Sequence, residues 1–297
     1  MAGIDINRTT SGISLPKAVS SEVWGLTIKE SAVMRAARRI SIPGSGIQID
    51  TLNGVGDAAW VSETAEKPVG AATFGNKVLE AYTLALIIPF SNQFRRDKAA
   101  LYNEIKRVLP AELGRKFDST VFGAITKPGS NFDNLAAATQ VTVDGTDTYG
   151  DLVSLYTSLG GTRPSAWITS PAFEATLMGA KSGSGEYLFV PNGSDAPNLG
   201  RVLGAPVYAT DGTFIQSTTL GDDVAVVGDF AGNTVWGSVE GIQYSESDQA
   251  TLTLADSSTV NLWQRNMFAV RFEIELAFGV RDISKFKRVT DGKIDTP

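Results

Sequence analysis

The sequence predicts an α+β protein that combines one long helix, long extended strands and a glycine-rich mixed unit. Apolar residues recur every four positions over 98–125, which indicates a helix whose apolar line slants round its axis. Two runs, 77–88 and 261–280, alternate apolar and polar side chains, as strands with one buried face do. Residues 127–262 hold 17 of the 30 glycines and alternate short strand and helix patterns, which favours a compact α/β unit inserted in the chain.

The first 45 residues predict an arm followed by a helix. Residues 1–20 are polar and small, so we expect an arm that becomes ordered on a neighbouring subunit. Residues 22–40 have the apolar content of a helix, and its end carries a basic cluster that favours a solvated helix end. The cluster consists of Arg35, Arg38 and Arg39. A Pro-Gly-Ser-Gly break at 43–46 ends this part.

A long hairpin with a polar tip is predicted next. Residues 47–52 and 58–62 look extended, and the alternating run 77–88 returns after a polar segment with glycines and a proline. A projecting two-stranded ribbon is marginal alone in water, so we expect this hairpin to lie on a partner.

The central helix is expected to start at Lys98 with Asp97 as its N-cap. Pro110 removes one hydrogen bond, which predicts a kink near Lys106, with two separate helices as the alternative. Beyond it we expect helices at 149–159 and 171–177, and strands at 166–169, 206–210, 224–230, 241–245 and 251–254. One face of the closing strand 261–280 is predicted to be buried, and it comprises Phe268, Val270, Phe272, Ile274, Leu276 and Phe278.

Composition excludes several classes of chemistry. The chain has no cysteine and no histidine, so disulfides, thiolate nucleophiles, Cys/His zinc sites and histidine bases are impossible. No phosphate-binding loop occurs, and Asp222 and Asp223 lack the spacing of a calcium loop. We therefore expect no catalytic residue, cofactor or metal, with a carboxylate-based hydrolase as the remaining enzymatic alternative. No apolar run is long enough for a bilayer, and 1–12 lacks the pattern of a secretory signal.

Basic residues gather near the central helix although the formal net charge is -6. Two interpretations stay open: a solvated helix, or a surface that faces nucleic acid without reading its sequence. The cluster comprises Arg95, Arg96, Lys98, Lys106, Arg107, Arg115 and Lys116.

The serial order of these parts carries a resemblance. The chain contains SAVMRAARR, then AAWVSETAEKPVGAATFG, LALIIPFSNQFRRDKA and GRKFDSTVFGA, and later WITSPAFEATL, LGAPVYATD, VGDF and NLWQRNMFAVRFEIELAFGVRDISKFKRVT. In this order they resemble the major capsid proteins of tailed bacteriophages, which have the Hong Kong 97-type fold. The resemblance implies an N-terminal arm at 1–30, an extended E-loop at 46–88, a peripheral (P) domain with a spine helix at 31–45, 89–126 and 258–297, and an axial (A) domain at 127–257.

The resemblance also implies a function. It implies self-assembly, as hexamers and pentamers, into an icosahedral shell that encloses double-stranded DNA. The implied location is the virion capsid, assembled in the host cytoplasm, with a portal and a separate scaffolding protein as partners and no membrane. The scaffolding expectation arises because the arm begins at Met1, without the long charged segment of many relatives. An encapsulin-like compartment and, in another class, a cell-surface adhesin are the alternatives.

Two sets of site residues follow. The hairpin tip is expected at a subunit interface, with aromatic anchors and charge pairs at Trp60, Glu63, Lys67, Pro68 and Phe74. The expected genome-facing residues are Arg95, Arg96, Lys106 and Arg107. Some relatives crosslink an E-loop lysine to a neighbour's asparagine, but the partners of that reaction have no match here, so it is not carried over.

Overall fold

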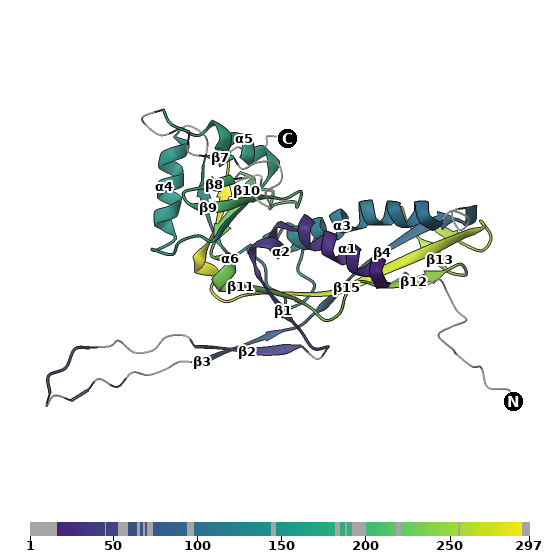
Figure 1. Cartoon of the computed structure of the whole chain (residues 1–297), viewed down its shortest axis with the longest axis horizontal. Helices are drawn as coiled ribbons and strands as arrows, with labels where there is room; N and C mark the ends of the chain where they lie inside the picture. Colours follow the sequence, from purple (N-terminus) through teal and green to yellow (C-terminus); the bar gives the residue numbers. More distant parts are fainter. Residues whose placement is uncertain are drawn as a thin grey trace.

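The structure, a computed structural model, has two sheet-based units and a projecting hairpin (Figure 1). It describes residues 17–44, 46–52, 59–63, 66–67, 69, 74–93, 98–143, 147–181, 185–187, 189–191, 200–217, 221–254 and 256–292. One unit is long and carries two parallel-lying helices, α1 and α3, whereas the other is shorter and holds α4 and α5. Among the described residues, no helix combines the length and apolarity needed to cross a membrane.

The long unit is built on β15 (Met267–Val280), the closing strand expected from the alternating run. One edge of β15 pairs antiparallel with β4 (Tyr82–Ser91). The other edge pairs with β12 (Gln243–Ser247) and then β11 (Thr234–Ser238), and β1 (Arg38–Ser41) lies parallel beside β11. The buried face is confirmed, since all six predicted side chains are at most 2 % exposed.

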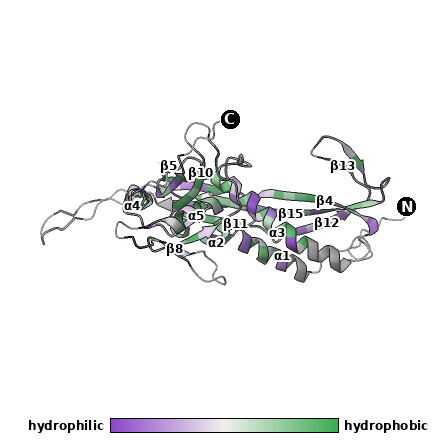
Figure 2. Cartoon of the chain, turned by 90° about the horizontal axis from the view of Figure 1, so that it is seen from above, coloured by the Kyte–Doolittle hydropathy of each residue, from purple (hydrophilic) through white to green (hydrophobic). Residues whose placement is uncertain are grey.

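Three helices cover one face of this sheet, as the view from above shows (Figure 2). They are α1 (Lys17–Glu30), α2 (Ala32–Ala36) and α3 (Lys98–Phe122). The four-residue apolar line of α3 is buried from Ile105 to Val121, which explains why this helix lies diagonally on the strands. Pro110 lies inside one continuous helix, so the alternative of two helices is wrong.

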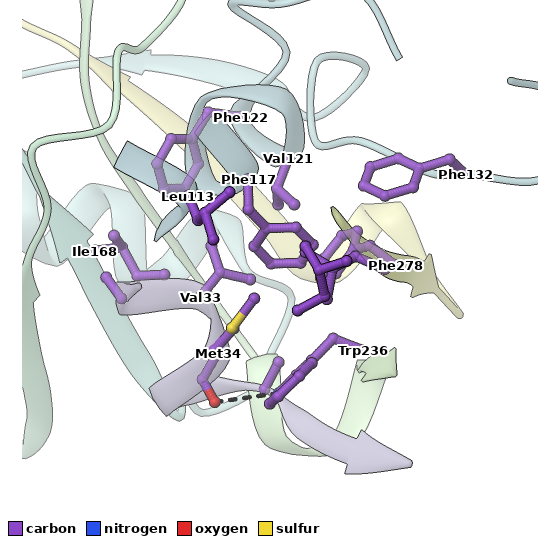
Figure 3. Packing of buried hydrophobic residues seen from close by; sticks show 14 of the residues in the cluster. Val33, Met34, Leu113, Phe117, Val121, Phe122, Phe132, Ile168, Trp236 and Phe278 are labelled. Atoms are coloured by element: carbon purple, nitrogen blue, oxygen red, sulfur yellow. Dashed lines mark hydrogen bonds between the residues drawn. The ribbon is translucent and has the colours of Figure 1, made fainter. Parts of the chain in front are cut away.

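Aromatic rings fill the layer between helices and sheet (Figure 3). Phe117 of α3 meets Phe278 of β15 edge-on, with ring centroids 6.2 Å apart. Trp236 of β11 donates its indole N–H to the carbonyl of Met34 at 3.1 Å, which satisfies the polar end of a buried ring.

Two predicted elements were wrong in extent. The helix expected at 22–40 is divided, because Ser31 starts a second helix by accepting a hydrogen bond from the Met34 amide, and Arg38 then begins β1. The strand expected at 77–88 is two strands with different partners. The first, β3 (Phe74–Leu79), pairs with β2 (Ile47–Leu52), whereas β4 joins β15.

The end of the chain differs from expectation in a similar way. The run 261–280 begins as β14 (Thr259–Asn261), which pairs with β13 (Thr251–Thr253), and then turns before β15 starts. Asn266 in that turn has a φ of 52°, a left-handed conformation that asparagine tolerates and that interrupts a strand.

The shorter unit contains a seven-stranded sheet in the order β5-β16-β10-β6-β9-β8-β7. The helices expected at 149–159 and 171–177 are α4 (Thr148–Ser158) and α5 (Pro171–Gly179). The strand expected at 224–230 stops earlier because Asp229 caps the short helix α6 (Phe230–Asn233). The strands are β5 (Thr139–Thr142), β6 (Ala166–Thr169), β7 (Val190–Pro191), β8 (Gly200–Val202), β9 (Ala205–Ala209), β10 (Asp223–Gly228) and β16 (Phe286–Thr290).

The chain crosses between the units several times. The last strand, β16, follows the 3-10 turn η2 (Ile283–Lys285) and inserts between β5 and β10. Conversely, β11 and β12 leave the glycine-rich region and join β15. The two units are therefore connected by several strands that cross between them, and not by one linker.

Candidate assembly surfaces

The root of the hairpin is anchored firmly to the long unit. Leu79 of β3 is buried with Ile42 and Ala277 in a small apolar cluster. The Lys77 ammonium forms an ion pair with Asp133 and donates to the carbonyl of Val280. The Asp133 carboxylate also accepts a hydrogen bond from the Val280 amide at 2.6 Å, so it links Lys77 of the hairpin to the end of β15.

The tip of the hairpin has the opposite character. Trp60 is fully exposed and Val69 is 98 % exposed, whereas Glu63, Glu66 and Lys67 are exposed charged residues beside them. In Figure 1 the described tip residues lie at the far end of the hairpin, away from both sheets. Large apolar side chains held this far from any core indicate a surface that another molecule covers.

Three of the five predicted tip residues can be placed there. Trp60, Glu63 and Lys67 lie at the exposed tip as expected. Pro68 lies outside the described residues, and for Phe74 the structure describes only the backbone, which pairs with Leu52 at the end of the β2–β3 ladder. The expected contact of Phe74 thus stays a prediction.

The genome-facing residues are described only in part. Arg95 and Arg96 lie outside the described residues, and Lys106 is placed in α3 without its side chain. Arg107 is exposed on α3, as are Arg115 and Lys116. Arg115 donates to Glu112 at 2.6 Å, so one of these charges is already paired. A solvated helix and a surface for phosphates both remain compatible with this face.

The basic cluster Arg35, Arg38 and Arg39 is not the solvated helix end that the sequence predicts. Arg35 is half-buried, donates to the carbonyl of Ala209 at 3.1 Å and lies over the Tyr208 ring, so it bridges the two units. Burial lowers the pKa of its guanidinium, which the nearby Asp118 partly offsets. Arg39 lies 5.5 Å from the ring centres of both Trp24 and Trp236.

Asp118 of α3 is a fully buried carboxylate that sequence reasoning missed. Its oxygens accept hydrogen bonds from Ser31 Oγ at 2.5 Å, Thr210 Oγ1 at 2.7 Å, and the amides of Ala32 at 2.9 Å and Val33 at 3.4 Å. Burial raises the pKa of Asp118 to about 6, against the opposing effect of these hydrogen bonds. One side chain thereby joins the α1–α2 corner, the central helix and the loop that follows β9.

A second buried charged group, the carboxylate of Asp223, connects three strands of the seven-stranded sheet. Arg288 of β16 donates to Asp223 of β10 at 2.7 Å, and Gln140 of β5 donates to the same carboxylate at 2.8 Å. Burial raises the pKa of Asp223, and the charge of Arg288 lowers it. Asp223 begins β10, and its contacts connect the three adjacent strands β5, β16 and β10.

The sequence carries only a partial local signal for these buried sites. Asp118 directly follows a residue of the apolar line, where a solvent-facing acid is not expected, and Ser31 has the character of an N-cap. Their pairing across 87 residues has no signal in a single sequence. Within the part of the chain that the structure describes, no group of acidic side chains is arranged to hold a metal ion.

Comparison with known proteins gives a consistent result. The phage capsid family matches the chain over residues 11–291. The probable major capsid protein gp17 of Mycobacterium phage L5 is 28 % identical over 285 residues, covering 89 % of this chain and 85 % of the relative. Its counterpart from Mycobacterium phage D29 matches with the same identity and coverage.

Solved structures agree on the fold. A chain from Mycobacterium phage Adephagia superimposes with a TM-score of 0.65 at 22 % identity, covering 90 % of this chain and 91 % of that one. A chain from Microbacterium phage Oxtober96 gives 0.66 at 18 % identity, covering 98 % and 96 %. The capsid of an empty GTA particle gives 0.65 at 13 % identity, covering 97 % and 94 %. The expected α+β fold of the Hong Kong 97 type is confirmed by this likeness.

Proposed function

Because the chain belongs to the phage capsid family, we propose that it is the major capsid protein of a tailed bacteriophage. Copies of it assemble as hexamers and pentamers into a closed icosahedral shell that encloses double-stranded DNA. The observation that carries this proposal is the family match over nearly the whole chain, supported by two relatives that are probable major capsid proteins.

The shape of the subunit supports assembly on physical grounds. The hairpin is anchored at its root but exposes Trp60 and Val69 at its tip. In a monomer these apolar side chains stay in contact with water, so their burial contributes nothing to stability. Covering one aromatic ring contributes about 1.5–3 kcal/mol, and a closed shell repeats that contact in every subunit. The subunit is therefore built to be completed by its neighbours.

The proposal divides the subunit as the resemblance implies. Residues 1–30 form the arm, 46–88 the E-loop, 127–257 the A domain, and 31–45, 89–126 and 258–297 the P domain with α3 as its spine helix. Two observations refine these ranges, since α1 (Lys17–Glu30) packs in the core beside α3, and β16 belongs to the seven-stranded sheet. The role is structural rather than enzymatic, and assembly takes place in the host cytoplasm with a portal and a separate scaffolding protein.

Contact with the packaged DNA is weak and independent of sequence. Among the described side chains of α3, the exposed cations are Arg107, Arg115 and Lys116. Arg115 is paired with Glu112, and the net charge of -6 disfavours tight binding. Arg95, Arg96 and Lys106 complete this surface in the proposal. Such a lining lets DNA enter and leave without being trapped.

Electron microscopy of the purified protein tests the proposal. We expect uniform closed shells from the wild-type chain, and unassembled subunits from a variant in which residues 53–73 are replaced by Asn-Gly, a turn that can close β2 onto β3. Circular dichroism shows that the shortened variant is folded. Monomeric wild-type protein under all assembly conditions contradicts the proposal. Shells that hold an enzyme cargo and no DNA, when isolated from infected cells, establish the encapsulin-like alternative.

A further inference from the structure

Two buried polar side chains of the shorter unit lack a hydrogen-bond partner in the part of the chain that the structure describes. Trp167 and Thr169 lie on β6, and both are 0 % exposed. The indole Nε1 of Trp167 and the hydroxyl Oγ1 of Thr169 form no hydrogen bond with any described residue. Buried polar groups in folded proteins are nearly always paired, with protein or with ordered water, because an unpaired one is destabilising. These two atoms therefore mark a place where the core requires a further hydrogen-bonding group.

Both side chains point to the same side of the sheet. They are two positions apart on one strand, so they share a face and their positions are about 6.6 Å apart along it. That face packs against α4 and α5 (Figure 1), because Trp167 belongs to the apolar cluster that contains Leu155 of α4 and Phe173 of α5. The intervening Ile168 belongs instead to the core cluster that includes residues of α3 and β15. The two unpartnered groups thus face one enclosed layer.

The strands on either side of β6 fill less of this layer beside Thr169 than beside Trp167. The paired residues on β9 and β10 are valines next to Trp167 and alanines next to Thr169, and each alanine has two carbon atoms fewer than a valine. They are Val207 and Val227 in the first case, and Ala209 and Ala225 in the second. The smaller side chains favour a small molecule beside the Thr169 hydroxyl.

The surrounding side chains determine which molecule can bind there. The indole N–H can only donate a hydrogen bond, whereas the hydroxyl can both donate and accept. The neighbours across the sheet and in the facing helices that are named above are apolar, so an ion would be buried without a countercharge at high cost. The occupant is therefore neutral and small, accepts one hydrogen bond and forms a second. Water meets these conditions, and buried waters form 2–4 hydrogen bonds to such groups.

The spacing of the two groups is compatible with one bridging molecule. A water with hydrogen bonds of about 2.9 Å joins two atoms up to about 5.8 Å apart. This reach is slightly less than the spacing of the two positions along β6, and side chains in strands lean along the strand direction. A modest lean of the long Trp167 side chain toward Thr169 closes the difference.

We propose that one water molecule is a structural component of the shorter unit, held between β6 and the α4–α5 layer. It accepts a hydrogen bond from Trp167 Nε1 and forms a second with Thr169 Oγ1. The water connects the middle of β6 to its last residue, directly before Ser170 caps α5. The site does not depend on the proposed function, and its loss lowers the stability of the subunit.

Thr169→Val tests the proposal because the sign of its effect depends on the water. Valine keeps the shape of threonine and lacks the hydroxyl. If the water is bound, the variant removes one of its hydrogen bonds, and the midpoint of urea unfolding of the unassembled subunit should fall. If no water is bound, the variant removes an unpartnered buried hydroxyl, and the midpoint should rise. A midpoint that rises or stays unchanged overturns the proposal.

Thr234→Val is the matched control for this substitution. Thr234 is 1 % exposed, and its hydroxyl donates to the carbonyl of Phe230 at 2.6 Å. Its loss removes a direct hydrogen bond, so the midpoint should fall in this variant whether or not water is bound at β6. The proposal predicts that Thr169→Val shifts the midpoint in the same direction as this control.

A map of the wild-type chain that resolves ordered water molecules, from a crystal or from electron cryo-microscopy, gives the direct reading. We expect a density peak within hydrogen-bond distance of both Trp167 Nε1 and Thr169 Oγ1. No peak between the two atoms, or a peak in contact with only one of them, overturns the bridging water even if Thr169→Val fails to fold.

Discussion

Replacing Asp118 by asparagine should weaken the subunit strongly while barely changing its shape. The carboxylate accepts four hydrogen bonds, from two hydroxyls and two amides, and both hydroxyls accept hydrogen bonds from other backbone amides. Their protons are therefore committed to Asp118. An asparagine has one acceptor oxygen, and its NH₂ group would face donors.

The cost can be worked out from these contacts. Two of the four donors lose their acceptor, and hydrogen bonds to a charged group contribute about 1.5–3 kcal/mol each. Asparagine is uncharged, so the variant avoids the cost of burying a charged carboxylate, and this offsets part of the loss. We expect Asp118→Asn to lower the free energy of unfolding by about 3 kcal/mol at pH 8.

The pH dependence gives the prediction a second test. The folded pKa of Asp118 is raised to about 6 from 3.8, so the folded state holds a proton that the unfolded state releases between these values. The resulting stabilisation is complete below pH 3.8 and is lost as pH rises through about 6. The wild type should thus gain about 1.4 kcal/mol per pH unit over the asparagine variant on acidification in this window.

Urea unfolding of the unassembled subunit at pH 8 and pH 5 measures both effects. Asp211→Asn, at an exposed aspartate in the adjacent loop, is the control and should change stability by less than about 0.5 kcal/mol. A deficit for Asp118→Asn below about 1 kcal/mol, or one that shrinks on acidification, would refute this reasoning.

Three further predictions concern other contacts. Trp60→Ala should reduce particle yield and melting temperature more than Lys67→Ala, because a buried ring contributes about 1.5–3 kcal/mol and an exposed ion pair about 0–1; the reverse order in paired measurements points to an electrostatic contact. Arg288→Leu leaves Asp223 buried without its cation, so chemical denaturation should show a loss of about 3–5 kcal/mol, and a loss under 1 would contradict the buried pair. Arg107→Ala should lower the salt dependence of DNA binding by about one phosphate contact, and an unchanged slope removes it from that surface.

The extent of sequence-based prediction varies with the range of the interactions involved. The apolar line of α3 and the alternation of β15 are local patterns, and both elements formed where these patterns lie. The exposed tip was also predictable, because one arm of the ribbon is too polar on both faces for a core strand, and this is itself a local signal. Elements whose identity depends on a distant partner were predicted less well.

Two cases show the physical reason. Residues 38–41 have the composition of a helix end, yet they form β1 because β11 offers a free edge about 200 residues later. Residues 77–88 alternate apolar and polar side chains without interruption. The strand pairing nevertheless changes at Glu80 and Ala81, because β3 before them pairs with β2 and β4 after them pairs with β15. Propensity cannot indicate such switches, since tertiary pairing overrides it.

The buried polar contacts were the least predictable part of the site. Asp118 and Asp223 form their hydrogen bonds with residues on other helices and strands, and Arg38 and Arg281 line a cavity together with residues of other elements. The cavity at the root of the hairpin, which residues of β1, β2, β3, β11 and β15 line, likewise exists only after the chain has folded.

Electron cryo-microscopy of purified particles shows both whether a shell closes and where each hairpin ends. We expect a closed icosahedral shell in which the tip around Trp60 lies on an adjacent copy. Open aggregates, or a hairpin folded back on its own chain with Trp60 covered by its own subunit, would contradict it.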